Sequence, residues 1–482
     1  METRSRRRKL AAVQAPAPAA AEAPKPKSAL EDQDPSLAGA DGGAGDSISQ
    51  LPDGVLGDII SLLPTKEGAR TQILASRWRH QWRSAPLNLD HLWLCRERNN
   101  LDAVVSRILA AHRGPGRRFS VPVYHLVGDR AATADAWLRS PALDDLQELD
   151  LCSFSGRLPF PPLSPQPPPA AAFRFSETLR VATIGECHLP DTTAQLLHFP
   201  KLKKLELEGV HISESSLHTI IAACPALECL LVQSSFGFYC LRINSISLRS
   251  IGGRFDKLII ENAPCLERLL QLGSRHWHPH ISVVSAPKLE TLGCLSSNYR
   301  DILAFDLTVI QGSRVNSLTT VVRTVKILAV DMDALSMDVV IDLMRCFPCL
   351  EKFYIESVGP GKTSSCRYKH KNLTSSLDIR LKTIVCRYYR GIKSHVDFAT
   401  FFILNAGALE LMTLHVNQEH YNEEFFGRQR KMLQLDSRAS RGAQFHFAPN
   451  DPHRYDIDFC LHDLDLADPF ERKDPGEFHA LL

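Results

Sequence analysis

The 482-residue sequence has no long uninterrupted hydrophobic run, and we take this to exclude a membrane-spanning helix. A helix that crosses a bilayer needs about 20 predominantly apolar residues in a row. The richest apolar stretch, residues 397–412, is interrupted in its middle by Asn405 and Gly407. We therefore expect a soluble protein.

Neither sign of charge dominates the sequence. Lys and Arg number 56 and Asp and Glu 54, which gives a net charge of +2. A nucleic-acid-binding domain usually carries a clustered basic face, and no basic stripe interleaved with aromatics follows the first ten residues. The composition therefore argues against a nucleic-acid partner. With 44% hydrophobic and 23% charged residues, it is that of a soluble globular protein.

A secretory signal is also missing. The first 20 residues begin with basic side chains, but prolines interrupt the stretch that would have to be an apolar helix. The 13 cysteines are scattered and odd in number, unlike a disulfide framework. We expect reduced thiols and a location in the nucleus and/or cytoplasm. The basic run at residues 4–9 is either a nuclear-import signal or a solvated tail.

Motifs that would indicate catalysis are absent. The sequence has no GxSxG, no phosphate-binding glycine loop, no HExxH and no kinase signature. Cys346 and Cys349 form one CxxC pair, but a zinc site needs a second pair. His276, His278 and His280 alternate around a proline without further ligands nearby. We therefore favour buried thiols and a polar loop over metal sites, and expect no enzymatic activity and no cofactor.

Residues 1–45 are rich in Ala, Pro, Gly and charge and almost lack aromatic and branched side chains. Such a segment cannot bury enough apolar surface to offset the entropy lost on ordering. We expect a disordered arm.

Residues 51–63 have the pattern of an amphipathic helix. Pro52 suits the first helical turn, and apolar residues recur at i, i+3, i+4 and i+7. Val55 and Leu62 widen this stripe beyond what one neighbouring helix would bury. Two interpretations remain open: another protein covers the extra surface, or the residues form only an internal three-helix core.

A second helix is expected after Pro64, with Thr65 as its cap. Gly68 lies inside it and costs about 1 kcal/mol of helix stability. We expect Ile73 and Leu74 to point inward from this helix, which runs toward Trp78 and Trp82 one turn apart. A segment this short and this apolar is marginally stable alone.

From residue 143 onward, an LxxLxL spacing recurs. Several copies follow an x-Pro-x-Leu lead-in; Pro200 and Pro225 lie 25 residues apart, and Pro264 and Pro287 lie 23 apart. Both steps fit leucine-rich repeats of about 20–29 residues. The copies are at 146–151, 178–184, 202–207, 227–232, 266–272, 289–295, 325–330 and 350–355.

In such repeats each strand directs its leucines into a shared core, and a helical return covers the other side. Residues 212–224 and 338–346 are the clearest helical returns. A generic α/β domain with leucine-rich strands is the alternative. Past residue 375 the order strand, Gly391 break, helix, strand indicates one larger αβ unit that caps the array, followed by a last strand and an acidic tail.

The segment near the N-terminus resembles an F-box, and the C-terminal unit resembles the FBD domain found with F-boxes in plants. The F-box pattern is carried by Leu51, Pro52, Asp53, Leu56, Ile59, Leu63, Pro64, Thr65, Lys66, Arg70, Thr71, Leu74, Ser76, Arg77, Trp78, Arg79, Trp82 and residues 86–90. The FBD pattern is carried by Leu381, Lys382, Tyr389, Arg390, Gly391, Val396, Phe398, Ala399, Phe402, Leu404, Asn405, Ala406, Leu409, Glu410, Met412 and Thr413. Gly68 departs from the F-box pattern.

The order F-box, degenerate repeats, FBD is similar to that of the plant F-box/FBD/LRR-repeat family. The resemblance implies an α/β fold with a three-helix F-box, a leucine-rich-repeat solenoid and an αβ cap. The implied division is an arm at 1–45, an F-box at 46–91, a solenoid at 92–370 with a Pro-rich insertion at 158–172, an FBD-like domain at 371–450 and an acidic tail at 451–482.

The resemblance also implies a function. F-boxes bind a Skp-family adaptor that links them to a cullin and a RING subunit of a ubiquitin ligase, so this chain would be a non-catalytic receptor for a protein target. The implied adaptor-binding residues are Leu51, Pro52, Leu56, Ile59, Leu63, Pro64, Leu74 and Trp78, with Arg70 and Arg77 as a polar rim. The alternative is a repeat-based scaffold that binds the adaptor without ligase activity.

Overall fold

The computed structural model describes residues 48, 50–63, 65–91, 101–122, 125–126, 128–152, 165–271, 279–296, 302–305, 308–311, 314–315, 321–357, 359, 377–450 and 460–471. The chain divides into two compact units, residues 1–51 and residues 52–482, and the following account concerns the second. None of the described helices combines the length and apolar character that crossing a bilayer requires.

The second unit opens with short helices: α1 (Asp53–Ser61), α2 (Thr65–Arg70), the 3-10 turn η1 (Thr71–Ile73) and α3 (Trp78–Ser84). Pro52 immediately precedes α1 with a φ of −58°, close to the helical value. Leu56, Ile60 and Trp78 are the buried apolar side chains between these helices. The predicted three-helix arrangement is confirmed.

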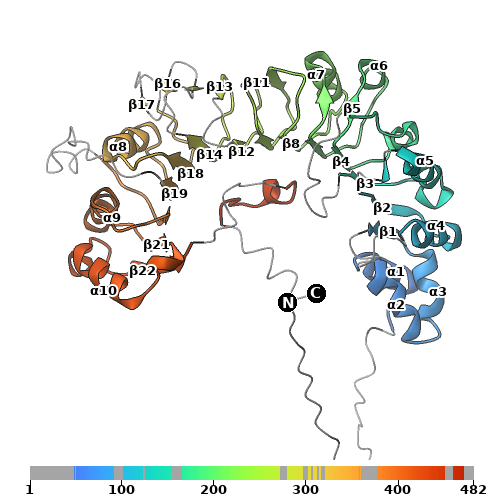
Figure 1. Ribbon diagram of the computed structural model, residues 1–482, viewed down its shortest axis with the longest axis horizontal. Coiled ribbons are helices and arrows are strands. Elements are labelled where there is room, and N and C mark those ends of the chain that lie inside the picture. Colours follow the sequence, from blue (N-terminus) through green and yellow to red (C-terminus); the bar gives the residue numbers. More distant parts are fainter. Residues whose placement is uncertain are drawn as a thin grey trace, which may run out of the picture. The chain divides into compact units, whose positions relative to one another are not determined.

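A single 14-stranded parallel sheet runs through the rest of the unit, and Figure 1 shows its strands side by side. Its strands, in spatial order, are β1 (Leu87–Asp90), β2 (Gly116–Ser120), β3 (Glu148–Leu151), β4 (Val181–Gly185), β6 (Lys204–Glu208), β8 (Cys229–Gln233), β10 (Ser250–Gly253), β12 (Arg268–Gln271), β14 (Thr291–Ser296), β18 (Ile327–Met332), β19 (Lys352–Ser357), β20 (Thr383–Arg387), β21 (Leu411–Val416) and β22 (Gln444–Pro449). Each LxxLxL segment identified in the sequence supplies one strand, so the repeat prediction is confirmed. The other six strands, β1, β2, β10, β20, β21 and β22, lie outside these segments.

The repeat leucines stack in register across this sheet. Leu205 pairs with Leu230, Leu230 with Ile251, and Ile251 with Leu269, and none of the four is more than 1% exposed. Each side chain is therefore covered by the strands on both sides. A single repeat cannot bury its own core, and the sheet is stable only as a stack.

Helices cover the outer side of the sheet at its two ends. They are α4 (Leu101–Ala111), α5 (Ala131–Leu138), α6 (Asp191–Ala194), α7 (Glu214–Ala222), α8 (Met337–Cys346), α9 (Lys393–Asn405) and α10 (Glu423–Met432). In α7 the Ser213 hydroxyl accepts a hydrogen bond from the backbone N–H of Ser216 at 3.2 Å and caps the helix, while Leu217 and Ile220 are buried. The helical returns predicted at 212–224 and 338–346 are confirmed as α7 and α8.

In the middle of the array a second sheet, rather than helices, lies beside the first. Its strands are β9 (Cys240–Asn244), β11 (Lys257–Asn262), β13 (His280–Val283), β15 (Ile302–Phe305), β16 (Thr308–Gln311) and β17 (Arg314–Val315). Leu241 and Ile243 are fully buried whereas Arg242 and Asn244 are exposed. This period of two favours a strand, so a strand stands here in the place of the helical return that such repeats usually have.

Shorter elements complete the second unit. They are the paired strands β5 (His188–Leu189) and β7 (His211–Ile212) and the 3-10 turns η5 (Gly128–Arg130), η6 (Pro141–Leu143), η7 (Ala170–Phe175), η9 (Gln418–His420), η10 (Leu435–Ser437) and η11 (Asp463–Asp465). The end of the proline-rich stretch therefore folds into η7, in which Phe175 is buried.

The C-terminal αβ unit follows the predicted order of strand, break, helix and strand. Gly391 lies between β20 and α9 with a φ of +65°, and a Cβ there would lie 2.3 Å from Nε2 of Gln429. The Tyr389 hydroxyl donates to Oε1 of the same glutamine at 2.7 Å. Glycine is required because both the backbone conformation and the adjacent amide exclude a side chain.

The second sheet makes a testable contribution to stability. Leu258 of β11 is fully buried, so Leu258→Ala should lower the free energy of unfolding by about 2–5 kcal/mol, measured by urea denaturation. Ile246 is 74% exposed, so Ile246→Ala should change it by less than about 0.5 kcal/mol. Equal unfolding midpoints for the two variants would show that the second sheet does not close the core.

Candidate functional site

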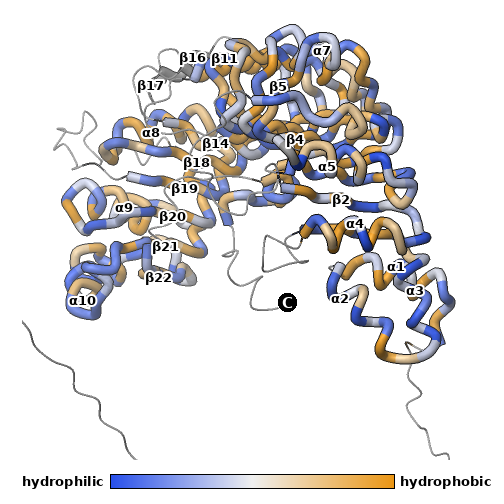
Figure 2. The backbone as a smooth tube through the Cα atoms, turned by 45° about the vertical axis from the view of Figure 1, so that its right-hand side comes forward, coloured by the Kyte–Doolittle hydropathy of each residue, from blue (hydrophilic) through white to orange (hydrophobic). Residues whose placement is uncertain are grey.

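One face of helix α1 is apolar and uncovered. Val55, Ile59 and Leu62 recur at i, i+4 and i+7, and their side chains are 42%, 38% and 71% exposed. Leu56 and Ile60 lie on the opposite face and are buried. Figure 2 shows hydrophobic and hydrophilic residues alternating along α1–α3. The stripe is therefore wider than the module itself can bury.

Two further apolar side chains, Ile73 and Leu74, are exposed where η1 ends. Their exposed fractions are 85% and 67%, so the expectation that they point inward is wrong. The α-helix ends at Arg70, and a 3-10 turn with about three residues per turn follows, which rotates the next side chains away from the interior. A regular helical period therefore does not predict the direction of these two side chains.

The residues expected to bind the adaptor occupy different environments. Leu56 and Trp78 are buried inside the helical module, Leu63 is half-buried, and Pro52, Ile59 and Leu74 are exposed. Arg70 pairs with Glu67 at 2.7 Å and Arg77 with Asp53 at 2.5 Å, both at the surface. Leu51 belongs to the other compact unit, and Pro64 lies outside the described residues.

The structure adds Val55, Leu62 and Ile73 to the exposed apolar set. The first two could be found from the sequence because they widen the helical stripe. Ile73 could not, since its exposure depends on the change from α-helix to 3-10 turn. We use the name open apolar face for the exposed apolar side chains of the helical module, which are Val55, Ile59 and Leu62 on α1 together with Ile73 and Leu74 at η1.

Gly68 lets the module close against the first repeat. A Cβ at this position would lie 3.1 Å from Cδ1 and 3.2 Å from Nε1 of Trp82. The Trp82 ring packs edge-on against His112, with ring centroids 5.4 Å apart, and Nε2 of His112 donates to the Ala85 carbonyl at 2.9 Å. Burial lowers the pKa of His112, so the ring stays neutral at neutral pH. The glycine that weakens helix α2 thus makes room for the indole.

The helical module is joined to the repeats by hydrogen bonds as well as by the chain. The backbone N–H groups of Arg113 and Gly114 donate to the Arg83 carbonyl at 2.9 and 3.0 Å. A guanidinium N–H of Arg117 donates to the Ser61 hydroxyl at 3.0 Å. The Thr65 hydroxyl donates to the carbonyl of Asn88 in β1 and accepts a hydrogen bond from the backbone N–H of Asp90. The module is therefore fixed to the first strands of the sheet.

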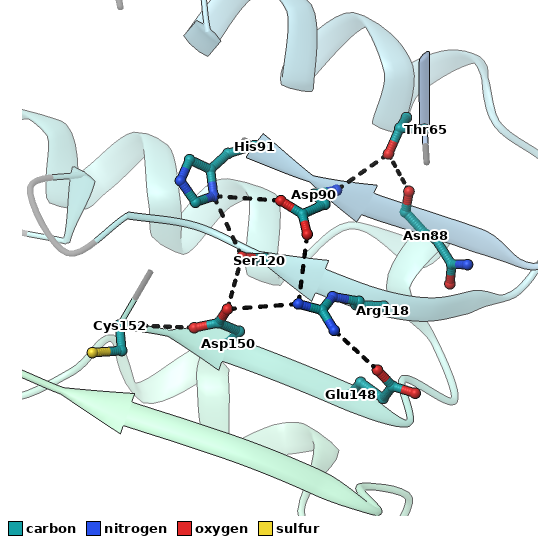
Figure 3. Close-up of polar contacts among 9 residues, drawn as sticks. All are labelled: Thr65, Asn88, Asp90, His91, Arg118, Ser120, Glu148, Asp150 and Cys152. Carbon is teal, nitrogen blue, oxygen red and sulfur yellow. Dashed lines mark hydrogen bonds and ion pairs between the residues drawn. The ribbon is translucent and has the colours of Figure 1, made fainter. Parts of the chain in front are cut away.

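The inner face of the sheet, opposite the helices, is polar at its N-terminal end. Arg118 lies between carboxylates of neighbouring strands, 3.5 Å from Asp90, 3.5 Å from Glu148 and 3.8 Å from Asp150, as Figure 3 shows. The Ser120 hydroxyl donates to Asp150 at 3.0 Å. This network joins β1, β2 and β3 through their side chains.

Farther along, the inner face becomes more acidic and then apolar. Burial, together with the nearby Glu208, raises the pKa of Glu206 to about 7. The next strands present Leu231, Leu270 and Ala329, which form a separate apolar cluster with Leu464 and Phe470 of the C-terminal segment. The sequence predicted only an acidic tail here, whereas residues 460–471 pack onto the sheet.

The CxxC pair and the three alternating histidines were the candidates for chemistry in the sequence. Burial raises the pKa of Cys346 to about 12, so this thiol of the CxxC pair is not a nucleophile at neutral pH. The described part of the chain holds no group of three or more His, Cys, Asp or Glu side chains placed to bind a metal ion. His276 and His278 lie outside that part, and His280 is in β13.

Comparison with known proteins agrees with this architecture. Residues 134–355 match the family model described as FBD-associated F-box protein At5g56370, LRR repeats, and residues 371–414 match the FBD model. The chain thus carries leucine-rich repeats of the FBD-associated F-box type followed by an FBD domain, and the predicted family resemblance is confirmed.

Several curated proteins of Arabidopsis thaliana are similar to the chain. F-box/FBD/LRR-repeat protein At1g13570 is 26% identical over 46% of this chain and 52% of its own length. F-box/FBD/LRR-repeat protein At5g56420 is 31% identical over 39% and 43%, and putative F-box/FBD/LRR-repeat protein At5g44950 is 28% identical over 44% and 48%. The chain spans about half the length of the curated relatives that it matches.

The fit between Gly68 and Trp82 can be tested by substitution. Gly68→Val forces a side chain into the indole and should destabilise the helical module by about 1–3 kcal/mol, seen as an earlier thermal transition in tryptophan fluorescence. Gly54→Val is the matched control, since a Cβ at that helical position meets no atom within 4 Å. If the two variants unfold alike, the packing role of Gly68 is refuted.

Proposed function

We propose that this chain, which carries the repeats and the FBD domain of the F-box/FBD/LRR-repeat proteins, is the substrate-recognition subunit of an SCF-type (Skp–cullin–F-box) ubiquitin ligase. Residues 46–91 act as the F-box that docks a Skp-family adaptor, and the repeat and FBD surfaces recruit a protein target for ubiquitination. The observation that carries the proposal is the open apolar face of a helical module too small to cover it.

The open apolar face has the composition of a protein-docking site. Val55, Ile59, Leu62, Ile73 and Leu74 expose large apolar side chains within 20 residues of sequence, a density that soluble surfaces seldom show without a partner. Removing such groups from water contributes about 25 cal/mol per Å². Arg70, Arg77 and Pro52, also at the surface, supply the polar and rigid rim that interfaces usually have.

The buried members of the predicted set support the interface from behind. Leu56 and Trp78 are enclosed by the module and hold α1 against α3. Leu63 is half-buried at the end of α1, and Leu51 and Pro64 flank the same helix in sequence. We assign Leu56, Leu63 and Trp78 a supporting role in adaptor docking rather than direct contact, and Leu51 and Pro64 stay predicted members of the interface.

A receptor of this kind works by positioning, and the junction between the helices and the sheet supplies the rigidity. The first strand of the sheet begins three residues after α3, and hydrogen bonds from the first repeat return to α3. A target held on the sheet is thereby kept at a fixed place relative to the adaptor. Ubiquitin transfer then gains from high effective concentration and needs no catalytic residue in this chain.

The alternative is a scaffold that binds the adaptor without ligase activity. Both functions use the open apolar face, so adaptor binding does not separate them. Cullin co-purifying with the complex of chain and adaptor supports the ligase subunit; adaptor without cullin supports the scaffold.

The adaptor-docking surface is tested by charge substitution at exposed positions. The double variant Ile73→Asp with Leu74→Asp should weaken capture of a purified Skp-family adaptor at least about 30-fold, which corresponds to about 2 kcal/mol, measured by titration calorimetry. Because both side chains are exposed, the fold should survive. Leu56 is unsuitable for this test, since an aspartate at a fully buried site would unfold the module.

Leu196→Asp is the matched control. Leu196 is 85% exposed, as Ile73 is, but lies in the repeats rather than in the helical module. Its substitution should leave adaptor affinity within about twofold. Adaptor binding that is equally strong in the double variant and the control would refute the F-box assignment.

A further inference from the structure

Residues 460–471 lie across the inner face of the sheet, from β6 to β19. Figure 1 shows this segment on the side of the sheet opposite the helices. Leu464 is fully buried, and Leu461 and Phe470 are 8% and 6% exposed. The segment is far from these strands in sequence, yet it fills the apolar middle of the face.

Leu464 occupies a notch that a glycine creates. Gly252 of β10 faces it, and a Cβ at that position would lie 3.0 Å from Cδ2 of Leu464 and 3.1 Å from Cδ1 of Leu231. The Ser250 hydroxyl donates to the Leu464 carbonyl at 2.9 Å. The side chain and the backbone at this position are thus both recognised.

Phe470 occupies a second notch two strands away. A Cβ at Gly293 of β14 would lie 2.9 Å from Cζ of Phe470. The ring of Tyr354 lies 5.4 Å from the phenyl ring, centroid to centroid, and Ala329 belongs to the same cluster. With strands about 4.8 Å apart, the two notches are separated by roughly 10 Å.

Carboxylates of the segment meet basic and hydroxyl groups of the sheet beside each notch. Asp465, next to Leu464, pairs with Lys204 and accepts from the Cys229 thiol at 3.2 Å. Asp468, two residues before Phe470, accepts from Lys352 and from the Tyr354 hydroxyl, both at 2.8 Å. Each apolar anchor therefore has its own charged partner site.

The segment is held like a docked peptide rather than like a strand of the fold. Its backbone–backbone hydrogen bonds among the described residues join members of the segment to each other, such as Asp465 N–H to the His462 carbonyl at 3.1 Å. Its contacts with the sheet named above are made by side chains of one or both partners. A pocket beside Phe470, lined by Asp331, Glu356 and Arg387 among others, extends the face toward β20.

We propose that the inner face between β6 and β19 is the target-binding site, and that it takes an acidic–apolar peptide. The chain's own segment shows the pattern that fits: a leucine-type residue followed by a carboxylate, then a carboxylate two residues before an aromatic ring. The segment occupies the site in the free protein, and a target with this pattern displaces it. This inference rests on the proposed function, because only a substrate receptor has a target to bind.

The test measures binding of a peptide in trans to the full chain. The probe is a fluorescein-labelled synthetic peptide with the sequence of residues 460–471 and serine at the cysteine position, followed by fluorescence anisotropy. The native chain is compared with Leu464→Ala/Phe470→Ala, in which the chain's own segment loses both anchors while the sheet is unchanged. Circular dichroism is used to check that both proteins are folded.

The released variant should bind the probe at least tenfold more tightly than the native chain, because the intramolecular competitor is weakened. Adding Lys352→Glu to the released variant should abolish this gain, whereas Lys382→Glu should not. Lys382 is the matched control: it pairs with Glu351 at 2.7 Å and makes none of the contacts with residues 460–471 described above. A probe with alanine at both anchor positions should not bind.

The inference is overturned if the folded released variant does not bind the probe, binds it no better than the native chain does, or binds it equally well with Lys352→Glu. Adaptor capture is measured on the same preparations. Lost probe binding with retained adaptor binding overturns this inference alone, and the reverse result overturns the proposed function alone.

Discussion

The fold depends on one constraint: no strand of this chain can bury its leucines without the strands beside it. Leu230 is fully enclosed only because Leu205 and Ile251 lie in register on either side. The same requirement extends to the helical module, whose exit becomes β1, the first strand of the sheet. Trp82, accommodated by Gly68, closes that junction. Stability therefore propagates along the whole sheet, from the helices to the FBD unit.

Two surfaces of the protein are apolar, one on the inner face of the sheet and one on the helical module, and they differ in what covers them. On the inner face, Leu464 and Phe470 fill notches at Gly252 and Gly293, so the apolar strip is covered by the chain itself. On the helical module, side chains such as Leu62 stay exposed. The difference supports both proposals: an adaptor protein covers the helical module, and a target peptide replaces the segment on the inner face.

The repeats can be predicted from the sequence because their leucines follow a short, local spacing. Strand β10 was missed because Gly252 and Gly253 weaken its pattern, and Gly252 is needed for a contact with Leu464 more than 200 residues away. The second sheet was not predicted, because repeats of this class usually have helices on that side. Residues 240–244 nevertheless alternate with a period of two, which is typical of a strand. Ile73 was misplaced because a 3-10 turn interrupts the helical period. Packing across long sequence distances caused the first error, and local backbone geometry caused the last.

The most direct test of the central claim is hydrogen–deuterium exchange of the full chain with and without a Skp-family adaptor. The account predicts that adaptor binding slows exchange only in α1 and in the turn at residues 71–74. Exchange in β8–β19 should not change. Protection of the inner-face strands, or none in the helical module at saturating adaptor, would contradict it.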